Sequence, residues 1–177
     1  MSYRQKIDVA KGLEIGCGNN PQPGYLHCDR YLDRNNIPFV DVCCDARRLP
    51  FRDGEFDSVL MFGVFEHLGL HEAQEALLEV SRCLKGGGIF KFDVPDFDWF
   101  VARYLDRKVA PHRDDEWFMK SFYGSQEREG MFHRWAWNQG RIEAFLAKPN
   151  WEFSSFKLVG RRWRDPEKNH LIYECVK

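Results

Sequence analysis

The chain has 177 residues, of which 44% are hydrophobic, and this is enough for one domain with a single core, expected over residues 1–177. The formal net charge of −1 excludes the strong positive field typical of proteins that bind nucleic acid or acidic membranes. No run approaches the roughly 18 apolar residues of a membrane span, and the first twelve residues have no apolar stretch of the secretory type. The six cysteines form no Cys-x-x-Cys pair, which favours reduced thiols and a cytoplasmic location.

Short apolar strands alternate with turns and one helix in the first half of the chain. The expected strands are 12–15, 25–29, 38–44, 56–62 and 89–94. Between the last two, apolar residues recur at helical spacing: Ala73, Ala76, Leu77, Val80 and Leu84. The glycines at 86–88 are expected to end this helix, because glycine accepts left-handed C-cap geometry. This order predicts an α/β fold, Rossmann-like, with a mostly parallel sheet.

The second half is richer in aromatic residues. Residues 95–137 hold 11 of the 27 aromatic residues of the chain. Helices are predicted in 96–108 and in 138–148, the latter capped by Asn138. Two closing strands, within 151–160 and 170–177, are expected to form an antiparallel hairpin joined by the polar link 161–169.

The glycine-rich loop after the first strand carries a family resemblance. Residues 13–18, Leu-Glu-Ile-Gly-Cys-Gly, resemble the first motif of class I S-adenosylmethionine-dependent methyltransferases. Glycines let the backbone turn sharply and approach a ligand where a Cβ would collide. NAD-binding folds share such loops, but the third glycine of their pattern is missing here.

The downstream segments resemble the later motifs of the same family, in order. Residues 45–68 and the helix, glycine turn and strand that follow match its pattern, so that the resemblance covers about residues 12–97. It implies seven strands with helices on both faces of the sheet, and S-adenosylmethionine as methyl donor with S-adenosylhomocysteine as product. The cofactor-binding residues that it implies are Glu14 (loop and ammonium group), Gly16, Cys17 and Gly18 (loop), Asp29 (ribose), Asp45 and Ala46 (adenine), and Phe62 and Gly63 (beyond the fourth strand).

The resemblance narrows to a small type 11-like branch, often linked to sugar or cell-surface polysaccharide pathways. Its members carry a Tyr-Gly…His element after the fifth strand, which residues 122–137 resemble. We interpret residues 95–137 as a lid and acceptor-site insert that excludes water. Ordinary core cover for the sheet is the alternative, and both roles are compatible. The chain departs from the family before the sixth strand, where the usual Gly-Phe is replaced by residues 148–156.

Three residues are candidates for removing a proton from the acceptor. His67 and Glu66 follow the fourth strand, and an imidazole titrates near neutral pH. His133, in the Tyr-Gly…His element, is placed to reach over the cofactor. Each has a structural alternative, as a residue that orders a loop or a packed lid.

Two further patterns are weaker evidence of function. His67 and His71 suit one helix face and a metal, but Gly69 lies between them and no third ligand is apparent, so no metal is expected. Residues 161–164, Arg-Arg-Trp-Arg, suit phosphate contacts, but a solvated turn is favoured and nucleic acid is not the expected partner.

The sequence therefore predicts methyl transfer to an oxygen or nitrogen of a small-molecule or saccharide acceptor by a monomer or homodimer. An RNA or protein methyltransferase and a catalytically silent S-adenosylmethionine-binding protein remain as alternatives.

Overall fold

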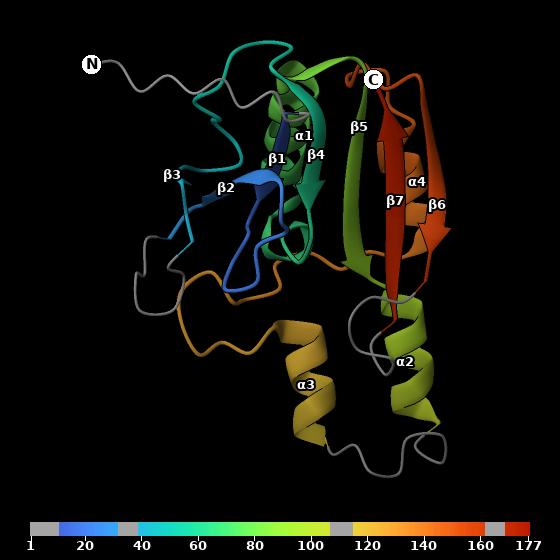
Figure 1. Cartoon of the computed structure of the whole chain (residues 1–177). Coiled ribbons are helices and arrows are strands. Elements are labelled where there is room, and N and C mark those ends of the chain that lie inside the picture. Colours follow the sequence, from blue (N-terminus) through green and yellow to red (C-terminus); the bar gives the residue numbers. More distant parts are fainter. Residues whose placement is uncertain (1–10, 32–38, 107–114, 162–168) are drawn as a thin grey trace, which may run out of the picture.

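The computed structural model describes residues 11–31, 39–106, 115–161 and 169–177. Seven strands form one sheet in the order β3-β2-β1-β4-β5-β7-β6 (Figure 1). Five pair in parallel: β1 (Gly12–Ile15), β2 (Tyr25–Asp29), β3 (Val42–Cys43), β4 (Phe56–Met61) and β5 (Leu84–Pro95). Two antiparallel strands, β6 (Ser155–Gly160) and β7 (His170–Val176), close the sheet against β5. The predicted mostly parallel sheet with an antiparallel hairpin is confirmed.

The apolar sequence of each strand matches the burial of its residues. β1 is buried along its whole length, as expected for a strand in the middle of a parallel sheet. On β7 every second residue is buried, which places Leu171, Tyr173 and Cys175 in the core. The opposite side of the β5, β7 and β6 strands carries an ion-pair row in which Glu174 binds both Lys91, at 3.0 Å, and Lys157, at 2.8 Å.

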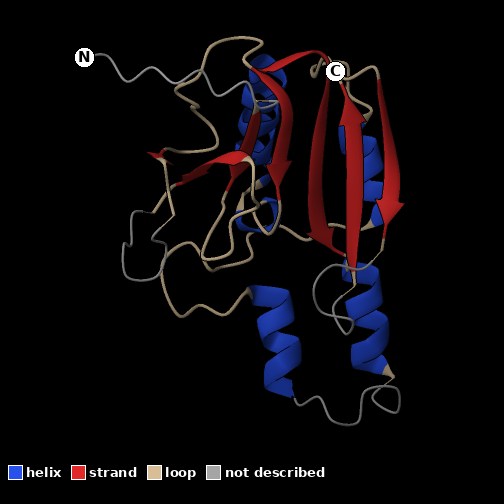
Figure 2. Cartoon of the chain, in the orientation of Figure 1, coloured by secondary structure: helices blue, strands red, loops and turns tan. Residues whose placement is uncertain are grey.

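Four α-helices and one short 3₁₀ helix are present in the described part of the chain (Figure 2). They are η1 (Phe65–His67), α1 (Leu70–Cys83), α2 (Phe97–Leu105), α3 (Asp115–Tyr123) and α4 (Gln139–Leu146). The predicted cap of α4 is confirmed, because the Asn138 side chain accepts a hydrogen bond from the Arg141 backbone N–H at 2.9 Å. The sequence analysis assigned no helix at α3.

Helices were expected on both faces of the sheet. The helices that pack on it in the described part of the chain, α1 and α4, both lie behind it in Figure 1, and their apolar residues share one core cluster with Phe90 and Phe92. The connection from β1 to β2, residues 16–24, contains two prolines and three glycines and forms turns in place of a helix.

Two predicted boundaries are wrong. The third strand is only Val42–Cys43, because residues 39–41 form a turn; residue 38 lies outside the described residues. The glycines at 86–88 do not cap α1, which ends at Cys83 with Leu84 already extended. They belong to β5 instead, where Gly87 has φ +78° and donates its N–H to the Lys177 carbonyl at 2.8 Å. A register shift between β4 and β5 accommodates them.

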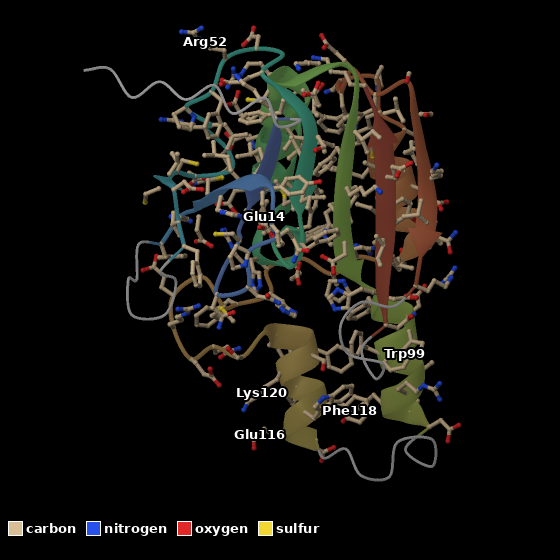
Figure 3. All side chains as sticks on the ribbon, in the orientation of Figure 1. Glu14, Arg52, Trp99, Glu116, Phe118 and Lys120 are labelled. Atoms are coloured by element: carbon tan, nitrogen blue, oxygen red, sulfur yellow. The ribbon has the colours of Figure 1, made fainter. Side chains whose placement is uncertain are left out.

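The α2 and α3 helices lie beyond the carboxyl ends of β4 and β5 (Figure 1). Phe118 of α3 points toward α2, where its ring meets Tyr104 at 5.4 Å between centroids, whereas Glu116 and Lys120 point away from it (Figure 3). Aromatic residues therefore hold this pair of helices together at the edge of the sheet where open α/β folds bind their ligands.

Candidate active site

The loop after β1 has the backbone that its glycines predicted. Gly16 and Gly18 have φ of +72° and +54°, which other residues rarely adopt. The Gly16 N–H donates to the Cys28 carbonyl of β2 at 2.8 Å. A Cβ on Gly16 would lie 2.3 Å from a Val64 methyl group, so glycine lets this loop pack against the segment after β4. A Cβ on Gly18 would meet nothing within 4 Å, so open space adjoins the loop there.

Asp29 ends β2 directly beside this loop. Its Oδ2 accepts a hydrogen bond from the Gly18 backbone N–H at 3.2 Å, and its Oδ1 accepts one from the Tyr31 backbone N–H at 3.0 Å. Each carboxylate oxygen can accept a further bond. The structure therefore joins Asp29 to the glycine loop, as a carboxylate that binds ribose hydroxyls requires.

Glu14 contacts the end of the glycine-rich loop. It is buried on β1, and its Oε2 accepts a hydrogen bond from the Gln22 backbone N–H at 2.7 Å. His27 on β2 lies 3.6 Å from the same oxygen and contacts the Gln22 carbonyl at 2.9 Å. Glu14 and His27 together fix the far end of the loop, and the sequence analysis did not single out His27.

Asp45 and the buried Ala46 follow β3 at the same edge of the sheet. The Asp45 carboxylate binds the Arg47 guanidinium through two hydrogen bonds, of 2.9 and 2.7 Å. These bonds hold the pKa of the Asp45 carboxyl below its usual range, so this residue is an anion at neutral pH. Arg47 also binds Glu72 of α1 at 2.9 Å, and Glu72 in turn pairs with Arg134.

A buried acid that the sequence analysis missed supports the turn after β4. Phe62 and Gly63 lie there, and Gly63 has φ +67°. The Gly63 N–H donates to Asp93 Oδ1 at 2.7 Å, and His170 Nδ1 contacts Asp93 Oδ2 at the same distance. Asp93 is fully buried on β5. Only its position two residues before the end of the strand, among apolar residues, signalled a role.

The three candidate proton acceptors, Glu66, His67 and His133, come together. One ligand-type atom from each lies within 4.8 Å of the other two, and the two imidazole rings are 5.0 Å apart between centroids. Residues 131–137, which we call the lid segment, form no helix or strand. A backbone contact holds this segment in place, because the Arg134 N–H donates to the Glu66 carbonyl at 2.7 Å. His71, by contrast, is 84% exposed and takes no part in this group, which we call the Glu-His-His cluster.

Burial raises the pKa of the Glu66 carboxyl above its usual range, with Asp93 adding to the effect and His67 opposing it. The protonated acid therefore stabilises the fold at pH values below its unfolded pKa of about 4.3. That contribution is lost as the pH rises through the higher folded pKa.

We expect Glu66→Gln to be more stable than the native chain at pH 7.5 in a metal-free buffer, and the gap to shrink toward pH 4.5. Chemical denaturation across this pH range measures it. Glu75→Gln, at a half-exposed position on α1, is the control and should show no such trend. An equal effect of Glu66→Gln at all pH values would contradict a raised pKa of the Glu66 carboxyl.

The Tyr-Gly…His element has a defined geometry. The His133 N–H donates to the Tyr123 carbonyl at 2.9 Å, and Gly124 forms a bridge with Phe132. Gly124 has φ +80°, and a Cβ there would lie 1.9 Å from the Met131 carbonyl oxygen. The glycine is therefore needed for the return of the chain that brings His133 to the cluster.

We expect Gly124→Ala to cost about 1–3 kcal/mol of unfolding free energy, from backbone strain and the clash with Met131. Gly140→Ala is the matched control. Gly140 lies in α4, and the nearest atom to its added Cβ is 3.9 Å away, so the change should stabilise by up to about 1 kcal/mol. Urea denaturation of both variants checks the two signs, and a neutral Gly124→Ala would contradict this geometry.

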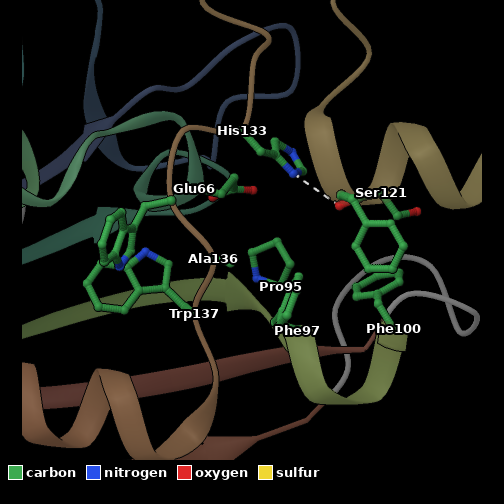
Figure 4. Close-up of a pocket in the computed structure, with 10 residues that line it drawn as sticks. Glu66, Pro95, Phe97, Phe100, Ser121, His133, Ala136 and Trp137 are labelled. Atoms are coloured by element: carbon green, nitrogen blue, oxygen red, sulfur yellow. Dashed lines mark hydrogen bonds between the residues drawn. The ribbon is translucent and has the colours of Figure 1, made fainter. Parts of the chain in front are cut away.

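Two pockets adjoin the cluster. One of about 450 Å³ has Phe97, Val101, Met119, Phe122, Tyr123, His133, Arg134, Trp135 and Ala136 in its wall. The other is a narrow space of about 20 Å³ between Glu66, Ser121, His133 and the aromatic residues around them (Figure 4). The larger pocket is of the size and apolar character of a small-molecule site.

Two remaining expectations from the sequence concern the arginine-rich motif and membrane spans. Residues 162–168, which include most of the Arg-Arg-Trp-Arg motif, lie outside the described residues. None of the helices in the described ranges is long and apolar enough to cross a membrane.

The comparisons with known proteins find similarity to methyltransferases. Residues 13–92 match the family described as "Methyltransferase domain". A ubiquinone/menaquinone biosynthesis C-methyltransferase of Xylella fastidiosa is 37% identical over 81 residues, which are 43% of this chain and 31% of that protein. A tRNA (carboxymethyluridine(34)-5-O)-methyltransferase of Xenopus tropicalis is 34% identical over 91 residues, 42% of this chain and 14% of that protein. The chain thus spans less than half the length of these curated relatives.

A solved structure extends the likeness to almost the whole fold. The S-adenosylmethionine-dependent methyltransferase of Thermotoga maritima described as a possible histamine N-methyltransferase superposes with a TM-score of 0.60 at 19% identity. The match covers 94% of this chain and 81% of that one. Residues 13–92 are thus similar to the methyltransferase domain family, and the fold resembles that of a solved S-adenosylmethionine-dependent methyltransferase.

Proposed function

We propose that the protein transfers a methyl group from S-adenosylmethionine to an oxygen or nitrogen nucleophile of a small-molecule or saccharide acceptor. The observation that carries the proposal is the Asp29 carboxylate at the end of β2, joined to a Gly16–Gly18 loop with open space beside Gly18. This arrangement fits a donor with an adenosine sugar and an amino-acid tail.

The residues at the carboxyl ends of β1 to β4 fit the parts of the donor. In this proposal the loop backbone at Gly16, Cys17 and Gly18 binds the amino-acid tail, with Glu14 fixing the loop. Asp29 binds the ribose hydroxyls, Asp45 and Ala46 face the adenine, and Phe62 and Gly63 line the remaining side. Open space beside Gly63, where a Cβ would meet nothing within 4 Å, supports that place. When bound, S-adenosylmethionine supplies a methyl group activated by a sulfonium, which leaves as a neutral thioether.

The acceptor site in this proposal is the pocket of about 450 Å³ under the lid, residues 95–137. Aromatic walls suit the apolar face of a sugar or a planar ring, and Arg134 suits an acidic substituent. Tyr123 and Phe132 are exposed at this lid, in positions that an acceptor would cover.

The Glu-His-His cluster is proposed to hold the nucleophilic atom of the acceptor and to take its proton. Both imidazoles contact backbone carbonyls through Nδ1, His67 to Phe132 at 3.0 Å and His133 to Ser121 at 3.1 Å. A neutral ring that donates from Nδ1 presents Nε2 as its basic nitrogen. Methyl transfer to a hydroxyl or amine requires such a group when the acceptor must lose a proton.

The test is transfer of an isotope-labelled methyl group from the donor to fractionated acceptors. Incubation with small sugars and sugar nucleotides, with RNA and with protein separates the proposed acceptor class from the two macromolecular ones. We expect label in the small-molecule fraction, reduced by Trp135→Ala, which lines both pockets, and unchanged by Trp99→Ala, which lines neither of them. Label confined to RNA or protein would replace the proposed acceptor class, and donor binding with no transfer to any fraction would indicate a silent binding protein.

Two properties complete the proposal. Free thiols at all six cysteines, buried or exposed, support a reducing, cytoplasmic location. Exposed apolar side chains on the lid, Phe97 and Met119 among them, are compatible with either a monomer or a homodimer.

A further inference from the structure

We propose that the Glu-His-His cluster is a divalent transition-metal site, with Zn²⁺ as the fitting ion, bound by Glu66, His67 and His133. The three residues come from two segments that are far apart in the sequence. η1 after β4 supplies the first two, and the lid segment supplies the third. The sequence analysis sought a metal partner for His67 at His71 and expected no site.

The spacing of the ligand atoms fits a common centre. Three atoms no more than 4.8 Å apart surround a point that lies within about 2.8 Å of each. Bonds from zinc to imidazole nitrogen or carboxylate oxygen are about 2.0–2.2 Å long, so each atom would move inward by less than about 1 Å. Rotations of side chains alone supply a movement of that size.

Both histidines have the outer hydrogen bond that metal ligands need. A metal-bound imidazole usually donates its second ring N–H to a carbonyl or carboxylate, which fixes its tautomer. Here His67 Nδ1 lies 3.0 Å from the Phe132 carbonyl, and His133 Nδ1 lies 3.1 Å from the Ser121 carbonyl. These contacts leave Nε2 as the ligating atom on both rings.

Glu66 supplies an independent observation. Its side chain is 4% exposed, and its Oε2 has no hydrogen-bond partner among the described residues. A buried carboxylate oxygen without a partner is costly, and a cation would remove that cost. Figure 4 shows the Glu66 carboxylate beside His133, at the narrow space of about 20 Å³, which has room for one water-sized occupant.

The donor set selects the kind of ion. Two imidazole nitrogens and one carboxylate oxygen are ligands of zinc and similar transition metals, whereas Mg²⁺ and Ca²⁺ prefer oxygen donors alone. Three protein ligands leave a fourth position of a tetrahedral ion open, as in catalytic zinc sites. Since His133 also lines the larger pocket, an acceptor oxygen or nitrogen in that pocket can take the open position.

The role of the ion, unlike the site itself, rests on the proposed function. A hydroxyl bound to Zn²⁺ loses its proton far more easily than a free one. With both Nε2 atoms on the metal, that proton passes to solvent and not to an imidazole. The resulting oxygen anion forms its bond to the methyl carbon as the carbon–sulfur bond breaks, and the electron pair stays on sulfur.

The experiment measures metal binding without the methyl donor. Protein stripped with a chelator is titrated with Zn²⁺ in competition with a chromophoric chelator, and separately with Co²⁺ by visible absorption. We expect one Zn²⁺ per chain, and d–d bands of Co²⁺ without the intense charge-transfer band that thiolate ligands produce. That band matters because the chain has six cysteines, and its presence would place the ion elsewhere and overturn the proposal.

Variants identify the ligands. His67→Gln, His133→Gln and Glu66→Gln should each weaken Zn²⁺ binding at least about 100-fold, whereas His71→Gln, at an exposed position of α1, should leave it unchanged. Circular dichroism of each stripped variant verifies its fold, and Glu66→Gln keeps the size of the side chain. Equal affinity in all four variants, or binding below one ion per chain at saturation, would overturn the site. Donor binding by the stripped protein tests the proposed function separately.

Discussion

Trp137→Ala is expected to destabilise the protein by about 3–5 kcal/mol, the usual cost of removing a buried tryptophan. Trp137 is 2% exposed and belongs to the main core cluster. Its ring meets Phe145 of α4 at 5.1 Å and Phe65 of η1 at 6.1 Å between centroids. The change would leave a cavity at the junction of the sheet, α4 and the segment that carries the Glu-His-His cluster. Urea denaturation followed by far-ultraviolet circular dichroism measures the loss.

Trp99→Ala is the matched control for that measurement. Trp99 is only partly buried on α2, where it contacts Phe100 and Arg103. Its removal should therefore cost much less than the removal of Trp137. Similar losses of unfolding free energy at the two positions would contradict the placement of Trp137 in the main core.

Asp29→Asn is expected to weaken binding of S-adenosylhomocysteine by roughly 10- to 100-fold. A hydrogen bond to a charged acceptor contributes about 1.5–3 kcal/mol, and the variant removes the charge while keeping the size of the side chain. The Gly18 and Tyr31 N–H groups now donate to separate carboxylate oxygens of Asp29. In the variant they would share one amide oxygen. Isothermal titration calorimetry on both proteins gives the ratio of dissociation constants.

Asp53→Asn serves as the control for that change. Asp53 is 82% exposed, and its ion-pair partner is Arg82, which is not part of the glycine loop. It should leave donor affinity unaltered. Unchanged affinity in Asp29→Asn, with a fold that circular dichroism shows to be intact, would remove the ribose contact from the proposal.

The elements with regular apolar patterns could be predicted from the sequence. β1, β2, β4 and α4 begin and end close to the predicted residues, because local signals such as the Asn138 cap coincide with the packing. The glycines at 86–88 misled the prediction of α1. A glycine run is a good helix terminator locally, but pairing of β5 with β4 and β7 drew it into a strand.

The candidate site was predicted in part. The glycine loop and the acids at the strand ends follow from spacing along the chain, since the carboxyl ends of parallel strands share one edge. The partners of those residues come from distant segments: Asp93 supports Gly63 across 30 residues, and the Phe132 carbonyl contacts His67 across 65. A pattern read along one sequence does not contain such pairs.

A chain of ion pairs connects the two halves of the site. Asp45 at the proposed adenine end binds Arg47, which binds Glu72 of α1. Glu72 in turn binds Arg134 of the lid segment, next to His133. Donor binding at Asp45, as proposed above, would therefore act on the same network that holds the lid. This offers a physical route by which the donor orders the acceptor pocket.

The most direct test of the central claim is calorimetric titration of the unmodified protein with S-adenosylmethionine and with S-adenosylhomocysteine. The fold and the Gly16–Asp29 arrangement predict saturable binding of each at one site per chain. No saturable binding of either compound up to millimolar concentration, by a protein shown to be folded, would contradict the account.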